Sequence, residues 1–171
     1  MSPKNLSIPI DTAKQVLTGL GINPTRRLIT QVSRFDRWKD PWGVIDAYRL
    51  AGRNIPGLQL ALVGDLVAQD DPDAQDVLRS VREYAGNDPD IHLFADRSVV
   101  ADQEVNAFQT ASDLVVQKSL REGFGLTIAE AMWKGTPIVG GDCGGVRLQI
   151  RHGETGFLVS NAEDCAARIV T

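Results

Sequence analysis

Apolar residues along the chain gather in six short runs, separated by segments of helical periodicity. The runs are rich in leucine and β-branched residues, and they span residues 28–32, 58–63, 91–94, 114–116, 137–139 and 156–159. Each run is long enough for one strand and too apolar for a strand with one face in water. This pattern is typical of strands that are buried on both faces, as in a parallel sheet.

The segments between these runs have apolar positions at offsets of three and four, which predicts helices. They span residues 11–20, 41–52, 73–86, 102–112, 125–134, 145–152 and 162–170. In the segment 125–134, the spacing places Leu126, Ala129, Met132 and Trp133 on one side, and Gly135 follows as a helix-ending residue. The alternation predicts an α/β fold: a Rossmann-like, doubly wound parallel sheet of about six strands with helices on both faces.

The length of the chain limits the number of domains. A chain of 171 residues suffices for one well-packed domain and is too short for two substantial ones. We expect a single domain over residues 1–171, with residues 1–23 as an adjunct segment that carries the first helix. The chain opens on a bare Ser-Pro-Lys-Asn stretch and stops inside the helical pattern 162–170. We therefore expect a fragment of a longer, two-domain enzyme.

Charge and composition exclude several classes of function. Eighteen Lys and Arg stand against 22 Asp and Glu, a net charge of −4, so we expect no binding to nucleic acid or to an acidic membrane. The chain has no apolar stretch near 18 residues and no apolar N-terminal signal segment, which favours a cytoplasmic protein. Two cysteines, Cys143 and Cys165, and two isolated histidines predict reduced thiols and no metal site.

The loops that follow the predicted strands carry the candidate chemistry, because open parallel sheets bind ligands at the carboxyl ends of their strands. Arg34 and Lys39 follow the first run, and Gly64 follows the second. Gly123 and Gly125 follow the fourth run, in a loop that enters a helix. Backbone N–H groups at a helix N-terminus bind anions, and lysine and arginine add positive charge. The sequence therefore predicts an anion pocket suited to a diphosphate.

Two glutamates flank the start of the helix predicted at 125–134. Glu122 lies in the preceding loop and Glu130 about two turns into the helix, eight residues on. Carboxylates accept several hydrogen bonds, so this pair is suited to hydroxyl groups of a ribose or of a sugar. The alternative is that Glu130 is an ordinary exposed helix residue.

Other residues of chemical interest have structural interpretations. His92 lies inside the third apolar run and is predicted to be a sheet residue, whereas His152 precedes the last run and is predicted to be solvated. The acidic run 70–73 is predicted to cap the helix at 73–86. The three tryptophans are predicted to be packing residues, with the one in the Arg34–Lys39 loop as the best exception: Trp38, Trp42 and Trp133.

The chain resembles the donor-binding, C-terminal domain of retaining GT-B glycosyltransferases of group one. The resemblance rests on Arg34 with Lys39, the string Glu122-Gly-Phe-Gly-Leu-Thr-Ile-Ala-Glu130 and the pair Gly144-Gly145. The string from Gln117 to Thr127, Gln-Lys-Ser-Leu-Arg-Glu-Gly-Phe-Gly-Leu-Thr, resembles the trehalose synthase and trehalose phosphorylase branch. The resemblance covers about residues 24–170. Many members of the family carry Pro-Ser at Lys118-Ser119 and Pro-Glu within 147–149, where this chain differs.

The resemblance implies a role for each of these residues. Arg34, Lys39 and Glu122 would be catalytic: the two cations would stabilise the departing diphosphate, and Glu122 would face hydroxyls of the donor sugar. Glu130 would bind the ribose, and the segment 94–99 would lie near the nucleobase. The remaining donor-binding residues would be Gly64, Phe124, Gly125, Leu126 and Thr127.

The resemblance also implies the reaction and the partners. Glucose would pass from UDP-, ADP- or GDP-glucose to a sugar acceptor such as glucose, to make trehalose in the intact enzyme. Donor departure and acceptor attack on one face would retain the configuration, with no protein nucleophile, no cofactor and no metal. The missing N-terminal domain would supply the acceptor site, so the chain alone would turn over little, and its exposed face favours a homodimer.

Three other interpretations compete with this one. A dinucleotide-binding domain of an oxidoreductase needs a Gly-x-Gly-x-x-Gly string after the first strand, where this chain has Ser33-Arg34-Phe35-Asp36. A non-catalytic nucleotide-binding or assembly module stays open, because half of an enzyme would behave as one. A GT-B nucleotide-sugar epimerase also stays open, and only the trehalose-like string 118–127 argues against it.

Overall fold

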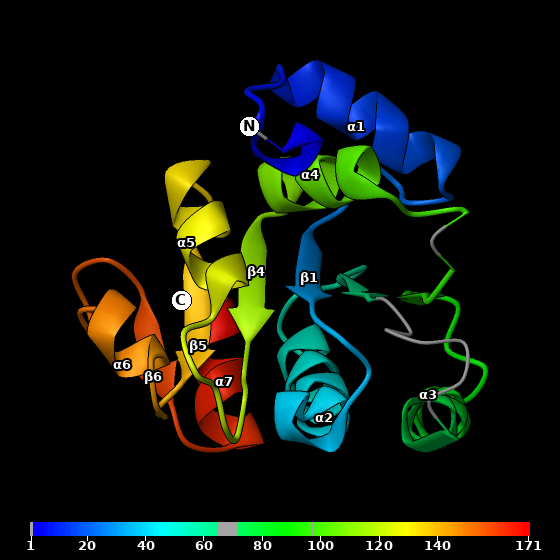
Figure 1. The fold of residues 1–171 in the computed structure, drawn as a ribbon. Helices are drawn as coiled ribbons and strands as arrows, with labels where there is room; N and C mark the ends of the chain where they lie inside the picture. The colour runs from blue at the N-terminus through cyan, green and yellow to red at the C-terminus, as the bar shows by residue number, and fades with distance from the viewer. Residues whose placement is uncertain (1, 65–71, 97) are drawn as a thin grey trace.

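A computed structural model describes residues 2–64, 72–96 and 98–171, and its centre is one six-stranded sheet (Figure 1). The strands are β1 (Leu28–Val32), β2 (Gln59–Val63), β3 (Ile91–Phe94), β4 (Leu114–Gln117), β5 (Ile138–Gly141) and β6 (Phe157–Val159). Their order is β3-β2-β1-β4-β5-β6, and every neighbouring pair is parallel. The predicted doubly wound α/β fold is confirmed, and the order of the strands reverses between β1 and β4.

The described helices match the predicted segments. They are α1 (Ile10–Gly19), α2 (Pro41–Gly52), α3 (Pro72–Ala85), α4 (Asp102–Ala111), α5 (Leu126–Trp133), α6 (Val146–Gln149) and α7 (Ala162–Val170), with short 3-10 turns η1 (Pro3–Asn5) and η2 (Arg37–Lys39). The segment 145–152 is the main difference, because α6 has four residues and the chain is extended again at Ile150.

Side chains of successive strand residues pack on opposite faces of the sheet, as the period of two in a strand requires. Leu60 and Leu62 of β2 belong to the core under α2, α3 and α7. Ala61 and Val63 belong to the core under α1 and α4, and α5 and α6 cover β4 and β5 on that same face. The adjunct helix α1 packs mainly on α4 (Figure 1).

The buried side of α5 differs from the prediction. Leu126 and Trp133 are 65% and 77% exposed, whereas Ile128 and Ala131 are fully buried against β4 and β5. The helix is apolar on more than one side, so its spacing alone does not decide which stripe meets the sheet. The prediction of Trp133 as a packing residue is therefore wrong.

The remaining structural predictions fall on several elements. His92 is half-buried in β3 with a lowered pKa, mainly from burial, and His152 is exposed, as predicted. Trp42 packs against the core and Trp38 is 46% exposed. Neither cysteine forms a disulfide. Of the acidic run 70–73, Asp73 lies in the first turn of α3, and residues 70 and 71 are outside the described part.

Candidate functional site

The loops after β1 and β4 lie against each other at the point where the strand order reverses. The ammonium of Lys39 is 2.5 Å from Glu122 Oε2. The backbone N–H of Leu120 donates to the carbonyl of Trp38 over 2.8 Å, and the Arg121 guanidinium lies 4.8 Å from the centroid of the Trp38 ring. The loops that the sequence places after two predicted strands therefore meet at the carboxyl edge of the sheet.

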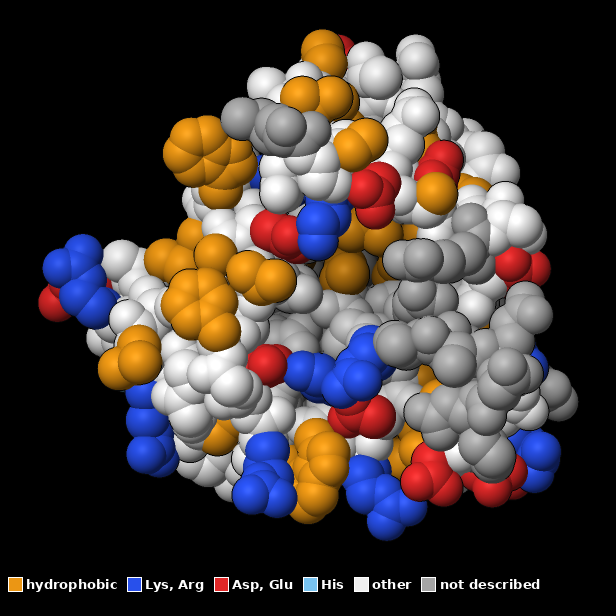
Figure 2. Space-filling model, viewed as in Figure 1, with side chains coloured by type: hydrophobic (Ala, Val, Ile, Leu, Met, Phe, Trp, Pro, Cys, Tyr) orange, Lys and Arg blue, Asp and Glu red, His pale blue; other side chains and the backbone are white. Residues whose placement is uncertain are grey.

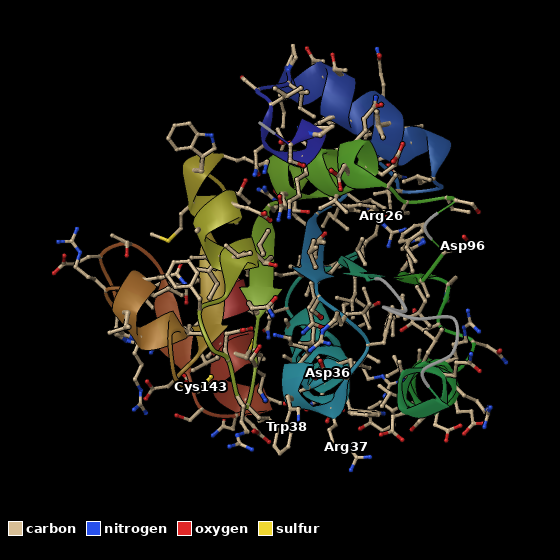
Figure 3. The ribbon with its side chains drawn as sticks, in the orientation of Figure 1. Arg26, Asp36, Arg37, Trp38, Asp96 and Cys143 are labelled. Carbon is tan, nitrogen blue, oxygen red and sulfur yellow. The ribbon has the colours of Figure 1, made fainter. Side chains whose placement is uncertain are left out.

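Local hydrogen bonds fix the position of Lys39. The Asp36 carboxylate accepts from the N–H groups of Trp38 and Lys39 over 2.8 and 3.1 Å, which closes the turn η2. The buried amide of Gln31, at the carboxyl end of β1, donates to the Lys39 carbonyl over 2.7 Å. Figure 3 shows Asp36, Arg37 and Trp38 gathered at this end of β1.

Lys118, in the loop after β4, has a structural partner. Its side chain is 6% exposed, and its ammonium pairs with Asp40. Asp40 has a left-handed backbone (φ 48°) and caps α2 by accepting from the N–H of Gly43 over 3.2 Å. This ion pair joins the loop after β4 to the start of α2.

Two neighbouring hollows open on this edge, and Arg34 lines both. The larger has a volume of about 600 Å³ and runs between the ends of β1 and β2 and the helices α4 and α5. The smaller, of about 450 Å³, lies over the joined loops, with Lys39 and Glu122 in its wall. Figure 2 shows a hollow near the centre of the face in view, with basic and acidic side chains at its upper and lower margins.

Four of the six predicted donor-binding residues border the larger hollow, and Phe124 and Gly125 line neither hollow. Gly64, Leu126, Thr127 and Glu130 line the larger one. The described residues of the segment 94–99, which was expected near a nucleobase, do not line the larger hollow, and residue 97 is outside the described part. The lining on this side comes instead from Val100, Ala101, Asp102 and Val105.

The N-terminus of α5 faces the larger hollow. Its N-cap residue is Gly125, which has φ 84° and makes no side-chain hydrogen bond to the N-terminal N–H groups. The Thr127 hydroxyl donates to the Val32 carbonyl over 3.0 Å, so it ties α5 to β1. The Gln149 amide donates to the Phe124 carbonyl and steadies the loop that enters α5, a contact that sequence reasoning missed.

Two glycines are required by close backbone contacts within the protein. A Cβ on Gly64 would lie 2.1 Å from the Ser33 carbonyl oxygen, and one on Gly145 would lie 2.1 Å from the Gly123 carbonyl oxygen. The N–H of Gly145 also donates to the Glu122 carbonyl over 3.1 Å. The loop after β5 thus supports the loop that carries Glu122.

The two glutamates lie in different hollows. Glu122 faces Lys39 in the smaller one. Glu130 lines the larger one, where its Oε1 is 2.7 Å from the ammonium of Lys4 and its Oε2 accepts from Gln109 Nε2 over 2.9 Å. The alternative that Glu130 is an ordinary exposed helix residue is wrong. Sequence spacing gave no signal for Lys4 or Gln109, because both contacts come from distant parts of the chain.

Cys143 lies beside the site, at the end of β5 (Figure 3). Its thiol donates to the Ser119 carbonyl over 3.1 Å. Burial, followed by the negative charge of Glu122, raises the pKa of the thiol, so it stays protonated at neutral pH. A protonated thiol is a poor nucleophile.

Metal-binding clusters and membrane-spanning helices are both absent from the described residues. No group of three or more histidine, cysteine, aspartate or glutamate side chains there is placed to hold a metal ion. No helix in residues 2–64, 72–96 and 98–171 combines the length and apolar character that crossing a membrane requires.

The family model described as glycosyl transferases group 1 matches residues 15–170. The chain belongs to this family. The family resemblance seen in the Arg34–Lys39 loop and in the 117–130 string is confirmed.

Curated relatives of this glycosyltransferase domain include enzymes named for trehalose. It is 46% identical to the trehalose synthase of Rubrobacter xylanophilus over 167 residues, which cover 98% of this chain and 40% of that protein. It is 34% identical to the trehalose phosphorylase of Grifola frondosa, over 84% of this chain and 21% of that protein. The chain spans about 40% of the length of the trehalose synthases that it matches.

Solved structures of glycosyltransferases share the fold. HepE of Anabaena in complex with UDP and glucose superimposes with a TM-score of 0.78 and 25% identity, over 99% of this chain and 43% of that one. The same protein in complex with UDP-glucose gives a TM-score of 0.79. The C-terminal domain of a group 1 glycosyl transferase from Francisella tularensis, at 23% identity and a TM-score of 0.72, shares the fold over 84% of its length.

Proposed function

We propose that the chain is the donor-binding domain of a retaining glucosyltransferase that takes glucose from a nucleoside diphosphate glucose. One observation carries the proposal: two adjacent hollows share Arg34 at the carboxyl edge of the sheet, one with Lys39 and Glu122 and the other with Glu130. A nucleotide sugar has the matching sequence of parts, a sugar and a nucleoside joined by a diphosphate. The shared wall is where the diphosphate would lie.

Arg34 and Lys39 would hold the diphosphate and stabilise its charge as it leaves. Arg34 is accessible to a ligand, because its side chain is 61% exposed; it pairs with Asp36 at 3.3 Å. Backbone N–H groups of the loop at Phe124 and Gly125 and of the first turn of α5 would add donors from a helix N-terminus. Charge stabilisation of a leaving group is a large catalytic effect in a site that excludes water.

Glu122 would contact hydroxyls of the donor glucose and Glu130 those of the ribose. Both carboxylates are largely buried, 13% and 11% exposed, and each already has a cationic partner, Lys39 and Lys4 respectively. Lys39 would then exchange part of its contact with Glu122 for the diphosphate. Departure and attack on one face of the sugar would retain the configuration, and no protein nucleophile or metal is required.

The acceptor and the intact enzyme are part of the same proposal. The relatives named trehalose synthase favour a sugar acceptor such as glucose, with trehalose as product, and they are about 2.5 times as long as this chain. Leu126, which lines the larger hollow, is 65% exposed, and Phe124, two residues before it, is 55% exposed. We propose that an N-terminal domain of the full protein covers this edge and completes the acceptor site. Without it, the chain would bind the donor nucleotide and turn over little.

The first experiment is calorimetric titration of the 171-residue chain with UDP, ADP, GDP and NAD. We expect one nucleoside diphosphate to bind and NAD not to bind; HepE of Anabaena, solved with UDP, makes UDP the first to try. The double variant Arg34→Ala with Lys39→Ala should weaken that binding at least tenfold, because each cation contributes charge-assisted hydrogen bonds to phosphate.

The matched control is Lys14→Ala with Arg79→Ala, which removes the same two charges from α1 and α3, at residues that line neither hollow. Its affinity should equal that of the unmodified chain. The proposal fails if the unmodified chain binds none of the nucleoside diphosphates, if it prefers NAD, or if the Arg34 and Lys39 variant binds as well as the control.

A further inference from the structure

Lys4 enters the larger hollow from outside the sheet. It belongs to the turn η1 (Pro3–Asn5), which precedes the first helix and lies on α4. Its ammonium is 2.7 Å from Glu130 Oε1, and its side chain lines the same hollow as Arg34 and Gly64. A cation from the N-terminal segment is therefore built into the wall next to the carboxylate that would meet a ribose.

The backbone on both sides of Lys4 is fixed by one buried amide. Asn106 of α4 is 1% exposed, and its Nδ2 donates to the Pro3 carbonyl over 3.1 Å and to the Leu6 carbonyl over 2.8 Å. The Ser2 hydroxyl also donates to Asp102 Oδ2 over 2.7 Å. A buried amide without hydrogen-bond partners costs free energy. These hydrogen bonds therefore hold the turn, and with it Lys4, at the hollow.

Glu130, the partner of Lys4, is also held in place by hydrogen bonds. Glu130 Oε2 accepts from Gln109 Nε2 over 2.9 Å, and Gln109 is fully buried. Gln109 Oε1 in turn accepts from the ammonium of Lys134 over 2.7 Å. Glu130 is thus fixed at both oxygens, and each oxygen keeps a lone pair for a further donor.

The pair presents donors and acceptors side by side. An ammonium has three N–H donors, and the ion pair with Glu130 uses one of them. A ribose hydroxyl can donate to a carboxylate and at the same time accept from an ammonium, so such a pair satisfies both properties of the hydroxyl group. Lys4 is 32% exposed in its side chain, which leaves its remaining donors accessible from the hollow.

We propose that Lys4 is a nucleoside-binding residue, which positions Glu130 and donates a hydrogen bond to a ribose hydroxyl oxygen of the donor nucleotide. This inference rests on the proposed function, in which Glu130 faces the ribose. It assigns the N-terminal turn to the donor site, although the turn lies outside the sheet and outside the residues that the family model matches. Lys4 acts on binding and selection of the ribonucleotide and takes no part in bond breaking.

The test compares two ligands that differ only in the ribose hydroxyls. UDP and 2′,3′-dideoxy-UDP are titrated into the unmodified chain and into Lys4→Met, with the ADP or GDP pair in their place if the chain prefers another base. We expect Lys4→Met to weaken UDP binding about tenfold, the effect of one lost hydrogen bond from a charged donor. Binding of the dideoxy ligand should change less than twofold.

Two variants separate a binding role from a structural one. Lys4→Arg keeps a cationic donor and should recover most of the UDP affinity. Lys14→Met removes one positive charge from the neighbouring helix α1, at an exposed residue that lines neither hollow, and should not change UDP binding. In a Glu130→Gln background, the further effect of Lys4→Met should be smaller than in the unmodified chain, because coupled residues are not additive.

Each result decides the inference. It is overturned if Lys4→Met binds UDP as the unmodified chain does, or if both ligands weaken equally, since a general loss of charge or of folding would do that. A chain that binds no nucleoside diphosphate overturns both this inference and the proposed function. A chain that binds UDP but ignores the Lys4 substitution overturns only the inference.

Discussion

Lys118 shows how a single buried residue can join two loops of the site. Its ammonium pairs with Asp40 below the candidate site, and both side chains are largely buried, 6% and 16% exposed. Asp40 also holds the first turn of α2 through the N–H of Gly43. Removal of one partner of a buried pair leaves the other charge without compensation. The pair therefore links the stability of the fold to the geometry of the loop that carries Lys39.

We expect Lys118→Met to lower the free energy of unfolding by roughly 3 kcal/mol, because it leaves the Asp40 carboxylate buried and unpaired. Urea unfolding followed by circular dichroism measures this loss. Arg79→Met is the matched control: it breaks the Arg79–Asp76 pair on α3, in which both side chains are 68% exposed, and should leave stability unchanged. Equal stability of the two variants would show that the buried pair is not a stabilising contact.

At the scale of the element, α5 shows what periodicity does and does not predict. The sequence predicts the helix and its approximate ends, since Gly135 and Pro137 follow an apolar segment. It does not predict which side is buried, because Leu126, Ile128, Ala131 and Trp133 offer more than one apolar stripe. The choice depends on how α5 packs against β4 and β5, where Ile128 and Ala131 meet the sheet.

This packing predicts that two large side chains of α5 contribute unequally to the free energy of unfolding. Ile128→Ala should lower the free energy of unfolding by about 2–5 kcal/mol, since it empties space in a fully buried core. Trp133→Ser should have little effect, because the indole is 77% exposed. Urea unfolding of both variants is the measurement. A large loss for Trp133→Ser would mean that the indole, and not Ile128, faces the core.

At the scale of the molecule, the order of strands and helices predicts the sheet, and the sheet predicts where the site lies. Arg34, Lys39 and Glu122 could be placed at one edge because each follows a strand of a parallel sheet. The sequence does not predict the contacts of Lys4, Gln109 and Gln149. These contacts depend on how η1, α4 and α6 pack on the rest of the fold. Sequence reasoning thus found the residues that the topology brings together and missed those that tertiary packing adds.

The burial of two ionisable side chains in the folded molecule predicts a loss of stability at alkaline pH. Burial raises the pKa of the Cys165 thiol in α7 to about 12, and burial, with the charge of Asp88 next, raises the pKa of the Tyr48 phenol in α2 to about 12. Both groups ionise at lower pH in an unfolded chain, near 9 and 10. Above those values the unfolded chain releases protons that the folded molecule retains, so the free energy of unfolding falls as pH rises from about 9 to about 12.

The loss should reach a few kcal/mol by about pH 11, since a group that is protonated only in the folded molecule costs roughly 1.4 kcal/mol of stability for each pH unit above its unfolded pKa. Urea unfolding at a series of pH values from 8 to 11 measures it in the unmodified chain and in Tyr48→Phe with Cys165→Ala. The double variant starts from lower stability, because it leaves a cavity, but its stability should depend less on pH. Parallel curves for the two proteins would show that other groups cause the alkaline loss. A weaker dependence of stability on pH in the variant would show that the alkaline loss arises from Tyr48 and Cys165. These residues lie in the core under α2 and α7, on the face of the sheet opposite α5.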